Sequence, residues 1–205
     1  ITELKLQQAR HANPLTLLPG NIPIQQCLQR LLERGVDAQL CYIDLDNFKP
    51  FNDLYGYGKG DEILLGLAQL LRELCDPRCD FVGHIGGDDF ILVMQSDDWR
   101  ERLNSLDNRF QQLCRTLYRA EHLQSRSFTA PDREGRWRSH DLLNLSIGIL
   151  PLIGSRARQF DPARLAELAS RAKHEAKRQR GFSLVIQDLP IDGLDDSERH
   201  LNLCS

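Results

Sequence analysis

The stretch at residues 81–94, FVGHIGGDDFILVM, decides how this sequence folds. It contains two short apolar segments joined at Gly86 and Gly87, and such a pair is typical of a two-residue hairpin turn, where both central residues need a positive φ. Asp88 and Asp89 follow directly. Strands are poor in aspartate and adjacent like charges repel, so a divalent cation is the obvious compensation for this pair. The alternative is a solvent-exposed turn with two solubilising acids.

A second acidic cluster lies at residues 39–53, QLCYIDLDNFKPFND. An apolar, strand-like run stops on Asp44, and strand alternation places Asp44 and Asp46 on one side and Leu45 on the other. If this strand lies beside the hairpin, Asp44 and Asp88 can bind the same cation. Mg²⁺ prefers a few carboxylates together with substrate phosphates. The two clusters therefore predict an enzyme that acts on a nucleotide.

Together these clusters resemble the GGDEF domain, the catalytic domain of diguanylate cyclases. The segments that carry the resemblance occur in the family's order: NPLTLLPGN at 13–21, DLDNFKPFNDLYGYGKGDEIL at 44–64, HIGGDDF at 84–90, LSIGIL at 145–150 and RAKHEAKRQRG at 171–181. The similarity extends over roughly residues 13–185, and the signature itself is the variant GGDDF.

The order of the expected elements gives a fold class. It is an α/β (α+β) domain in which a central, mainly antiparallel five-stranded sheet is flanked by helices, similar to the palm of nucleotidyl cyclases and polymerases. An insertion at residues 119–141 is expected to form an extra β-hairpin around DREG. On the last helix, Lys173, Lys177 and Arg180 fall on one face. Apolar residues at helical spacing predict core helices at residues 23–33, 62–74, 99–118 and 163–180.

Three segments make up the expected domain organisation. These are a linker helix at residues 1–12, the GGDEF domain at 13–186, and an acidic, turn-rich tail at 187–205 that is loosely held. The resemblance suggests that a similar insertion occurs in GGDEF domains that follow an EAL phosphodiesterase module and a CBS pair. The chain begins with Ile1, so we expect it to be a piece of a longer protein with a sensor or EAL and CBS domains upstream.

The resemblance also implies a metal site and catalytic residues. Asp44, the carbonyl of Leu45 and Asp88 would hold Mg²⁺ or Mn²⁺, with two ions in the usual arrangement. The metal would neutralise phosphate charge and acidify the attacking hydroxyl. Asp88 would accept the proton with Asp89 in support, and Lys49 would complete the catalytic set.

The substrate-binding positions that the resemblance implies divide between the phosphates and the base. Backbone N–H groups after the acidic strand would cradle phosphates, and two lysines would add charge. An amide and a carboxylate would read guanine, although Asp61 could instead cap the helix that follows it. The hairpin glycines would let the guanosine lie against the turn. The full set is Asn47, Phe48, Lys49, Asn52, Asp61, Gly86, Gly87 and Lys177.

The implied reaction condenses two GTP molecules into cyclic di-GMP, with each 3′-hydroxyl attacking the α-phosphate of the other nucleotide. One domain holds one GTP, so catalysis requires a homodimer. Two alternatives remain open: a catalytically weak GTP-binding domain that regulates an attached EAL phosphodiesterase, and a purely structural dimerisation module. GTP binding without turnover separates the first alternative from the cyclase, and absence of GTP binding leaves only the second.

Several positions depart from the family pattern. Asp89 stands where the family has Glu and is one methylene shorter. Tyr57 stands where a His is frequent, and His84 where an Arg is frequent. After the last helix, the usual Gly-Arg is reversed as Arg180-Gly181, which affects one expected phosphate contact.

The product-inhibition motif of the family, Arg-x-x-Asp, is also incomplete. Asp80 is present just upstream of the hairpin, but Pro77 occupies the position of the Arg. We therefore expect no feedback inhibition through this site.

Composition excludes several other classes. A formal net charge of -3 over 205 residues argues against a duplex nucleic-acid binder, and the alternation of arginines with acids in the insertion favours a solvated excursion. The sequence has no apolar run of membrane-spanning length and no signal peptide, so a cytoplasmic domain without direct membrane insertion is expected. Its cysteines lack C-x-x-C spacing, which favours buried free thiols.

Overall fold

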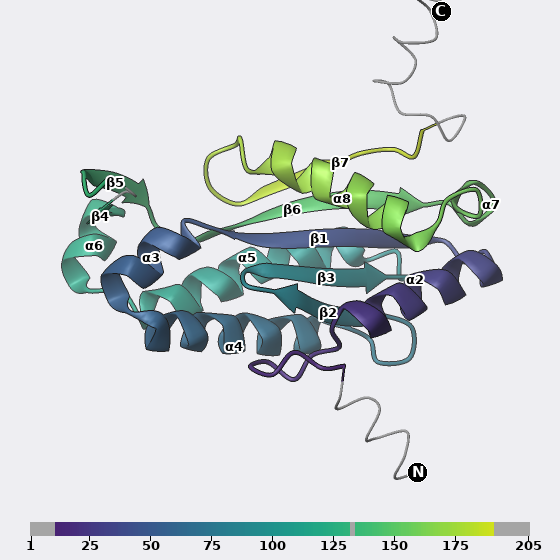
Figure 1. Cartoon of the computed structure of the whole chain (residues 1–205), viewed down its shortest axis with the longest axis horizontal. Helices are drawn as coiled ribbons and strands as arrows, with labels where there is room; N and C mark the ends of the chain where they lie inside the picture. Colours follow the sequence, from purple (N-terminus) through teal and green to yellow (C-terminus); the bar gives the residue numbers. More distant parts are fainter. Residues whose placement is uncertain (1–10, 132–133, 191–205) are drawn as a thin grey trace, which may run out of the picture.

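The computed structural model describes residues 11–131 and 134–190 and has a five-stranded sheet at its centre (Figure 1). The strand order is β2-β3-β1-β6-β7, and all neighbours are antiparallel except β6 and β7. This confirms the predicted mainly antiparallel sheet. The strands are β1 (Ala38–Asp46), β2 (Phe81–Gly86), β3 (Asp89–Met94), β6 (Asn144–Leu152) and β7 (Ser183–Ile186).

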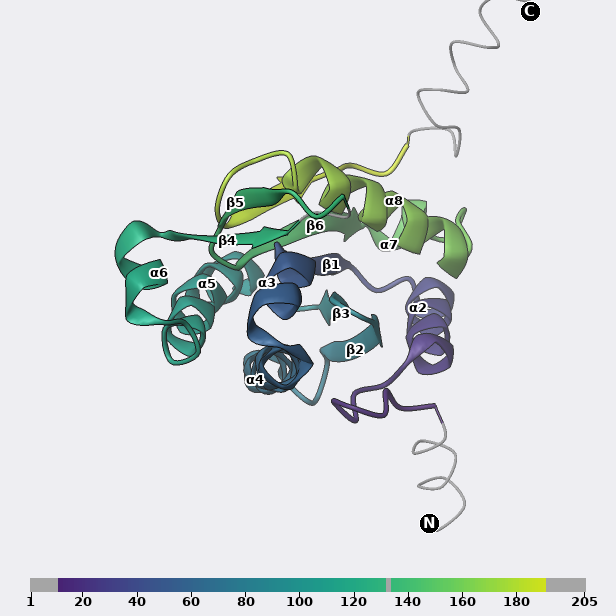
Figure 2. The ribbon, with the colours of Figure 1, turned by 60° about the vertical axis from the view of Figure 1, so that its left-hand side comes forward.

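Helices cover both faces of this sheet (Figure 2). One face packs against α2 (Asn21–Arg34) and α8 (Pro162–Ala176), and the other against α4 (Tyr57–Leu74) and α5 (Trp99–Arg115). Two short helices complete this part of the fold: α3 (Phe48–Tyr55) follows β1, and α7 (Gly154–Ala157) follows β6. A sheet buried on both faces explains why β1 and β3 read as nearly continuous apolar runs.

Strand alternation divides the core into two clusters. Leu40 and Tyr42 of β1 face α2 and α8, whereas Cys41, Ile43 and Leu45 face α4 and α5. Asp44 therefore lies on the α8 side of the sheet, at the end of the strand where the apolar pattern stops. The fold thus buries a carboxylate beneath one particular helix.

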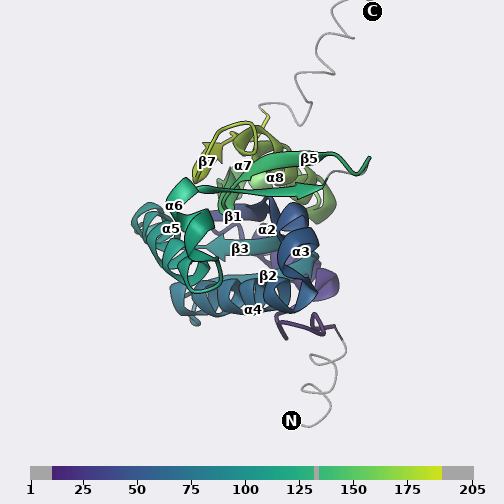
Figure 3. The ribbon, with the colours of Figure 1, turned by 90° about the vertical axis from the view of Figure 1, so that its left-hand side faces the viewer.

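The insertion forms α6 (Ala120–Ser125) and the hairpin of β4 (Ser127–Pro131) and β5 (Trp137–Asp141), which confirms the predicted extra hairpin. The short helix α6 was not predicted. Figure 3 shows these elements at the same end of the molecule as α3. Aromatic rings attach them: Tyr55 of α3 contacts His122 through its hydroxyl and packs edge-on against the buried Phe128.

Two expectations about the strands were wrong by one or two residues. The strand β1 continues past Asp44 to Asp46, because both residues pair with β6. The hairpin turn lies at Gly87 and Asp88 rather than at the two glycines, since Gly86 pairs with Asp89 across a register shift. This irregularity adds one residue to β2, which the sequence pattern does not reveal.

Two expectations about the helices were also wrong. The helix that carries Asp61 begins at Tyr57, so Asp61 lies inside α4 and does not cap it. The last helix ends at Ala176, so Lys177 is its C-cap and Arg180 lies beyond the helical face. Lys173 is the member of the predicted basic face that remains within α8.

The ends of the described chain are tied to the domain. Ala12 forms a bridge with Pro19, and residues 1–10 of the predicted linker helix lie outside the described residues. At the other end, Gln187 N donates to Ile149 O (2.9 Å) and Leu189 is buried, so the start of the predicted loose tail is fixed. The remaining tail, 191–205, lies outside the described residues.

The described part of the chain contains no helix long and apolar enough to cross a bilayer. Five cysteines in it are free thiols, of which Cys41 and Cys114 are buried, in keeping with the prediction for these two. Burial raises the pKa of the Cys114 thiol to about 12, so it is a structural and not a reactive group.

Gly148 controls how closely α8 approaches the sheet. A Cβ built on Gly148 of β6 would lie 2.1 Å from the backbone N of Lys173 and 2.5 Å from the backbone O of Ala169. Both neighbours are main-chain atoms of α8, which cannot move without moving the helix. Glycine is therefore required here for space, and the close approach brings α8 side chains to the acidic end of β1.

We predict that Gly148→Ala destabilises the domain by about 1–3 kcal/mol, because α8 must be pushed away from β6. Chemical denaturation of the nucleotide-free protein measures this change. The matched control is Gly58→Ala in α4, where a Cβ meets nothing within 4 Å and alanine favours the helix. Equal stability of the two variants would contradict the proposed role of Gly148.

Candidate active site

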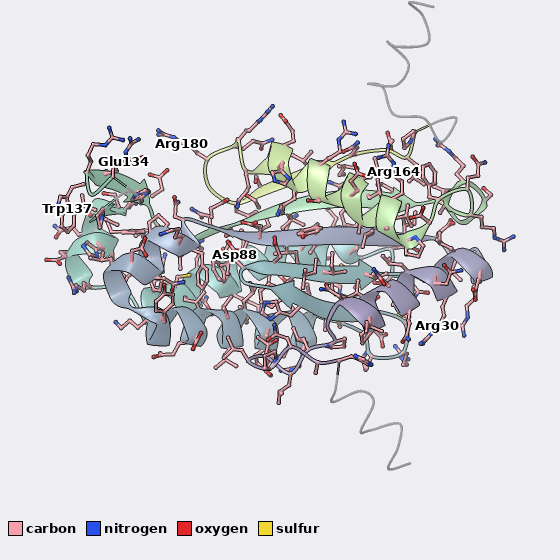
Figure 4. The ribbon with its side chains drawn as sticks, viewed as in Figure 1. Arg30, Asp88, Glu134, Trp137, Arg164 and Arg180 are labelled. Carbon is pink, nitrogen blue, oxygen red and sulfur yellow. The ribbon has the colours of Figure 1, made fainter. Side chains whose placement is uncertain are left out.

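Three carboxylates meet at the end of β1 and β3. Asp44 and Asp89 are directly opposite each other in the β1–β3 register, and Asp88 occupies the turn beside them, as labelled in Figure 4. One oxygen of each lies within 4.8 Å of those of the other two. The structure therefore brings Asp44 and Asp88 together, as the sequence predicted, and adds Asp89 to the same cluster.

His84 contacts the hairpin turn from the buried side of the sheet. Its Nε2 lies 3.0 Å from Gly87 O, its Nδ1 lies 2.9 Å from the Thr16 hydroxyl, and its ring stacks on Phe90. A carbonyl only accepts, so Nε2 carries the proton and Nδ1 accepts from Thr16. Burial lowers the pKa of His84, which favours the neutral ring this arrangement needs. Sequence reasoning noted His84 only as a departure and missed its supporting role.

Gly86, at the end of β2, and Gly87, in the turn, have backbone angles that other residues avoid. Gly86 has φ +151° and Gly87 has φ +57°, and a Cβ at either would meet nothing within 4 Å. Glycine is therefore required at these two positions for its backbone conformation and not for lack of space.

Two lysines of α8 neutralise the carboxylates. Lys173 Nζ lies 3.1 Å from Asp44 Oδ1 and 2.8 Å from Asp89 Oδ1. Lys177 Nζ lies 2.5 Å from Asp44 Oδ2. The sequence predicted Lys177 as a site residue, but it placed Lys173 only on a basic helical face. The signal that could have found Lys173 is a lysine in register with the buried Leu165, Leu168, Ala169, Ala172 and Ala176.

Burial governs the ionisation of the acids on β1. It raises the pKa of Asp44 to about 6, against the opposing effect of the hydrogen bond and charge of Lys177. Burial also raises the pKa of Asp46, which accepts a hydrogen bond from Ser146 Oγ (2.7 Å). Asp44 is thus largely ionised at neutral pH but protonates more readily than an exposed aspartate, and Asp46 is held against β6.

The loop from β1 into α3 contains the expected phosphate-binding backbone. Asn47, the N-cap of α3, has the left-handed angles φ 62° and ψ 18°, and Phe48 is buried in the core. The helix α3 therefore begins directly after the acidic end of β1, and helix geometry leaves its first N–H groups without intrahelical partners. The Lys49 side chain is exposed and pairs with Asp53 one turn later (2.7 Å), so it does not contact the carboxylates.

The two residues expected to read guanine lie on neighbouring helices. Among the described residues, Oδ1 of Asn52 is buried and has no hydrogen-bond partner. It packs against Gly60, where a Cβ would lie 1.9 Å from it. Asp61 follows Gly60 and is exposed. An unpaired buried acceptor is costly, so Oδ1 of Asn52 suits a partner that offers an N–H group, and the exposed carboxylate of Asp61 suits the same kind of partner.

Arg180 lies away from this cluster. Figure 4 shows its side chain at the outer end of the loop after α8, far from Asp88 and on the side of the β4–β5 hairpin. Gly181 follows with φ +78°, a conformation suited to glycine. The reversed Arg180-Gly181 order therefore does not bring a guanidinium into the acidic site.

Comparison with known proteins identifies this arrangement. A family model described as "Diguanylate cyclase, GGDEF domain" matches residues 11–182. The chain belongs to the GGDEF family. It is 32% identical over 130 residues to the diguanylate cyclase DgcP of Escherichia coli, covering 57% of this chain and 38% of that protein. It is 30% identical over 145 residues to the diguanylate cyclase DosC of Shigella sonnei. This match covers 71% of this chain and 27% of that protein. The chain thus spans well under half of these relatives.

Solved GGDEF structures share the fold. The diguanylate cyclase SiaD of Pseudomonas aeruginosa, solved with its activator SiaC, superposes with a TM-score of 0.65 at 23% identity, covering 91% of this chain and 65% of that one. The GGDEF domain of DgcB from Caulobacter crescentus, solved with c-di-GMP, superposes with a TM-score of 0.57 at 18% identity. This match covers 86% of this chain and 95% of that one. These likenesses confirm the predicted fold class.

Asp80, the residue of the product-inhibition motif that is present, makes structural contacts within the domain. Asp80 has a fully buried side chain; its Oδ2 accepts from Arg102 of α5 (2.6 Å), and its Oδ1 accepts from Gln95 N (2.9 Å). Arg78 is exposed, with 86% of its side chain accessible, and pairs with Asp76. Asp80 therefore has no free oxygen directed to the surface for a ligand.

We predict that Arg78→Ala leaves the affinity for cyclic di-GMP unchanged, because Arg78 and Asp80 do not form a joint ligand site. Calorimetric titration of cyclic di-GMP into the wild type and the variant measures this. Arg30→Ala, which removes an exposed arginine of α2 (Figure 4), is the control. A loss of affinity of about tenfold (about 1.4 kcal/mol) or more in Arg78→Ala alone would contradict the prediction.

Proposed function

We propose that this domain condenses two GTP molecules into cyclic di-GMP and pyrophosphate. The observation that carries the proposal is the meeting of Asp44, Asp88 and Asp89 at one end of the sheet, where β1 leads directly into the N-terminus of α3. Membership of the GGDEF family supports the same reaction.

The donor set fits a hard divalent cation such as Mg²⁺ or Mn²⁺. The donor atoms are carboxylate oxygens that lie close to one another. Mg²⁺ and similar ions take oxygen ligands, usually one or two carboxylates, and complete their coordination shells with phosphate oxygens and water. Asp44, the Leu45 carbonyl and Asp88 would hold the ion. When bound, it would neutralise phosphate charge and lower the pKa of the attacking hydroxyl.

The triphosphate would be bound by the chain's own N–H and ammonium groups. The first N–H groups of α3, at Asn47, Phe48 and Lys49, form an anion-binding helix terminus. Lys177 is more than one-third exposed and ends α8, so it can exchange Asp44 for a phosphate oxygen. Lys49 can exchange Asp53 in the same way, because exposed pairs contribute little stability.

The guanine base would be selected by Asn52 and Asp61. The unpaired Oδ1 of Asn52 can accept a hydrogen bond, and the exposed Asp61 carboxylate can accept from the N1–H and amino group of guanine. Gly60 leaves room for the Asn52 amide, and the hairpin glycines Gly86 and Gly87 leave room for the nucleoside. Adenine offers a different pattern, which gives the site its preference for GTP.

Proton transfer from the 3′-hydroxyl is assigned to Asp88. Asp89 is already paired with Lys173, which leaves it as an electrostatic support. Because one domain binds one GTP, the second nucleotide must come from a homodimeric partner that faces the same site.

A second candidate function is a GTP-binding domain with little turnover that regulates an attached domain such as an EAL phosphodiesterase. Two observations favour it: Asp89 is shorter than the usual Glu and is occupied by Lys173, and Arg180 lies away from the site. Both functions require GTP binding, so product formation distinguishes them.

We predict that Asp88→Ala abolishes cyclic di-GMP synthesis, because removal of the proton acceptor costs roughly 10²- to 10⁴-fold in rate. Protein at concentrations high enough to form dimers is incubated with GTP and Mg²⁺, and cyclic di-GMP and pyrophosphate are both quantified. Asp97→Ala, which removes an exposed carboxylate beyond β3, is the control and should keep wild-type activity.

The outcomes separate the two functions. GTP binding by the wild type without product would favour the regulatory domain over the cyclase. Product that persists in Asp88→Ala would remove Asp88 from its assigned role, and absence of GTP binding in the wild type would overturn both functions.

A further inference from the structure

Lys173 has no part in the reaction set out above except to hold Asp89, yet it lies at the centre of the site. Only 5% of its surface is accessible. It projects from the apolar side of α8, and Gly148 brings its backbone against β6. A lysine is rarely this buried, because removing an ammonium from water is unfavourable unless opposite charges compensate it.

Three groups surround the Lys173 ammonium. Its Nζ lies 2.8 Å from Asp89 Oδ1, 3.1 Å from Asp44 Oδ1 and 4.5 Å from the centre of the Tyr42 ring. The ammonium donates hydrogen bonds to the two carboxylate oxygens, and the face of the Tyr42 ring adds a cation–π contact. Burial opposes the charge, but the carboxylates of Asp89 and Asp44 raise the pKa of Lys173 above its ordinary value.

Lys177 differs in each of these respects. It has 36% of its side chain exposed and contacts a single carboxylate oxygen, Asp44 Oδ2, at 2.5 Å. Lys177 can therefore leave the carboxylates and reach solvent or a phosphate. Lys173 cannot do so without leaving a buried ammonium and two carboxylates unpaired. The site thus has one fixed cation and one exchangeable cation.

We propose that the Lys173 ammonium permanently takes the place of one of the two divalent ions expected at this site, so that each domain binds a single Mg²⁺ or Mn²⁺. The charges agree with this. Asp44, Asp88 and Asp89 together carry three negative charges, and Lys173 cancels one of them. Once Lys177 leaves, the remaining two charges match one divalent ion, which Asp44 Oδ2 and Asp88 are free to bind.

The proposal deepens the proposed function and shares its assumption that the acidic cluster binds a metal. It is tested without nucleotide by titrating Mn²⁺ into the protein and measuring free Mn²⁺ by electron paramagnetic resonance. We expect one bound ion per wild-type chain. In Lys173→Met, which keeps the length but removes the charge, we expect a second ion.

Two further variants make the test specific. Lys177→Met also removes a charge that contacts Asp44, but it leaves the fixed ammonium in place, so one ion is expected. Lys173→Arg restores the charge, and one ion is expected again. Circular dichroism establishes that each variant is folded before the ions are counted.

The proposal is overturned if the wild type binds two ions, or if folded Lys173→Met binds the same number as the wild type. If Lys173→Met does not fold, the wild-type count alone decides. If Lys173→Met binds two ions and the wild type binds one, but the wild type makes no cyclic di-GMP, the role of Lys173 is supported and the cyclase function is not. Product formation with an unchanged ion count would support the cyclase and overturn the role of Lys173.

Discussion

The mutual repulsion of three carboxylates at one end of the sheet is the constraint on which the rest of the site depends. The β1–β3 register fixes Asp44 opposite Asp89, and the turn adds Asp88. Water cannot screen Asp44, which is buried, so the fold must supply positive charge. It does so through α8, whose apolar side forms the core and whose lysines reach the acids. Gly148 serves both purposes, since its close contact with α8 lets the helix pack on β6 and also brings Lys173 to the carboxylates.

A second constraint is the rigidity of the hairpin. An aspartate in a two-residue turn is well placed for chemistry only if the turn itself is held, because active-site groups must keep their geometry within about 0.5 Å. Here a neutral, stacked His84 supports the carbonyl of Gly87 from the buried side. The turn is therefore fixed by the core and open on its outer side. This division suits a site that must bind a nucleotide against a stable surface.

Much of this could be predicted from the sequence, and the failures have physical causes. Strand alternation correctly placed Asp44 on the opposite face from Leu45, since successive side chains point to opposite faces even in a strand that is buried on both. The turn was misplaced by one residue because the register shift after His84 depends on pairing across strands. The early start of α4 was missed because Gly58 and Gly60 weaken the helical pattern, although packing against Asn52 requires Gly60. Lys173 was missed because its register with the apolar side of α8 was not weighed, and because its carboxylate partners lie on strands far away in the sequence.

The pairing of fixed and exchangeable cations has a consequence for the order of binding in the proposed function. Without nucleotide, Lys177 contacts Asp44 Oδ2, so a metal that binds this oxygen must displace Lys177. A triphosphate at the N-terminus of α3 offers Lys177 a stronger partner, and its departure frees that oxygen. Nucleotide and metal should therefore bind with positive coupling, since each favours the arrangement that the other requires. The coupling is the same for a cyclase and for a GTP-responsive regulatory domain, because it depends on the binding of nucleotide and metal and not on turnover.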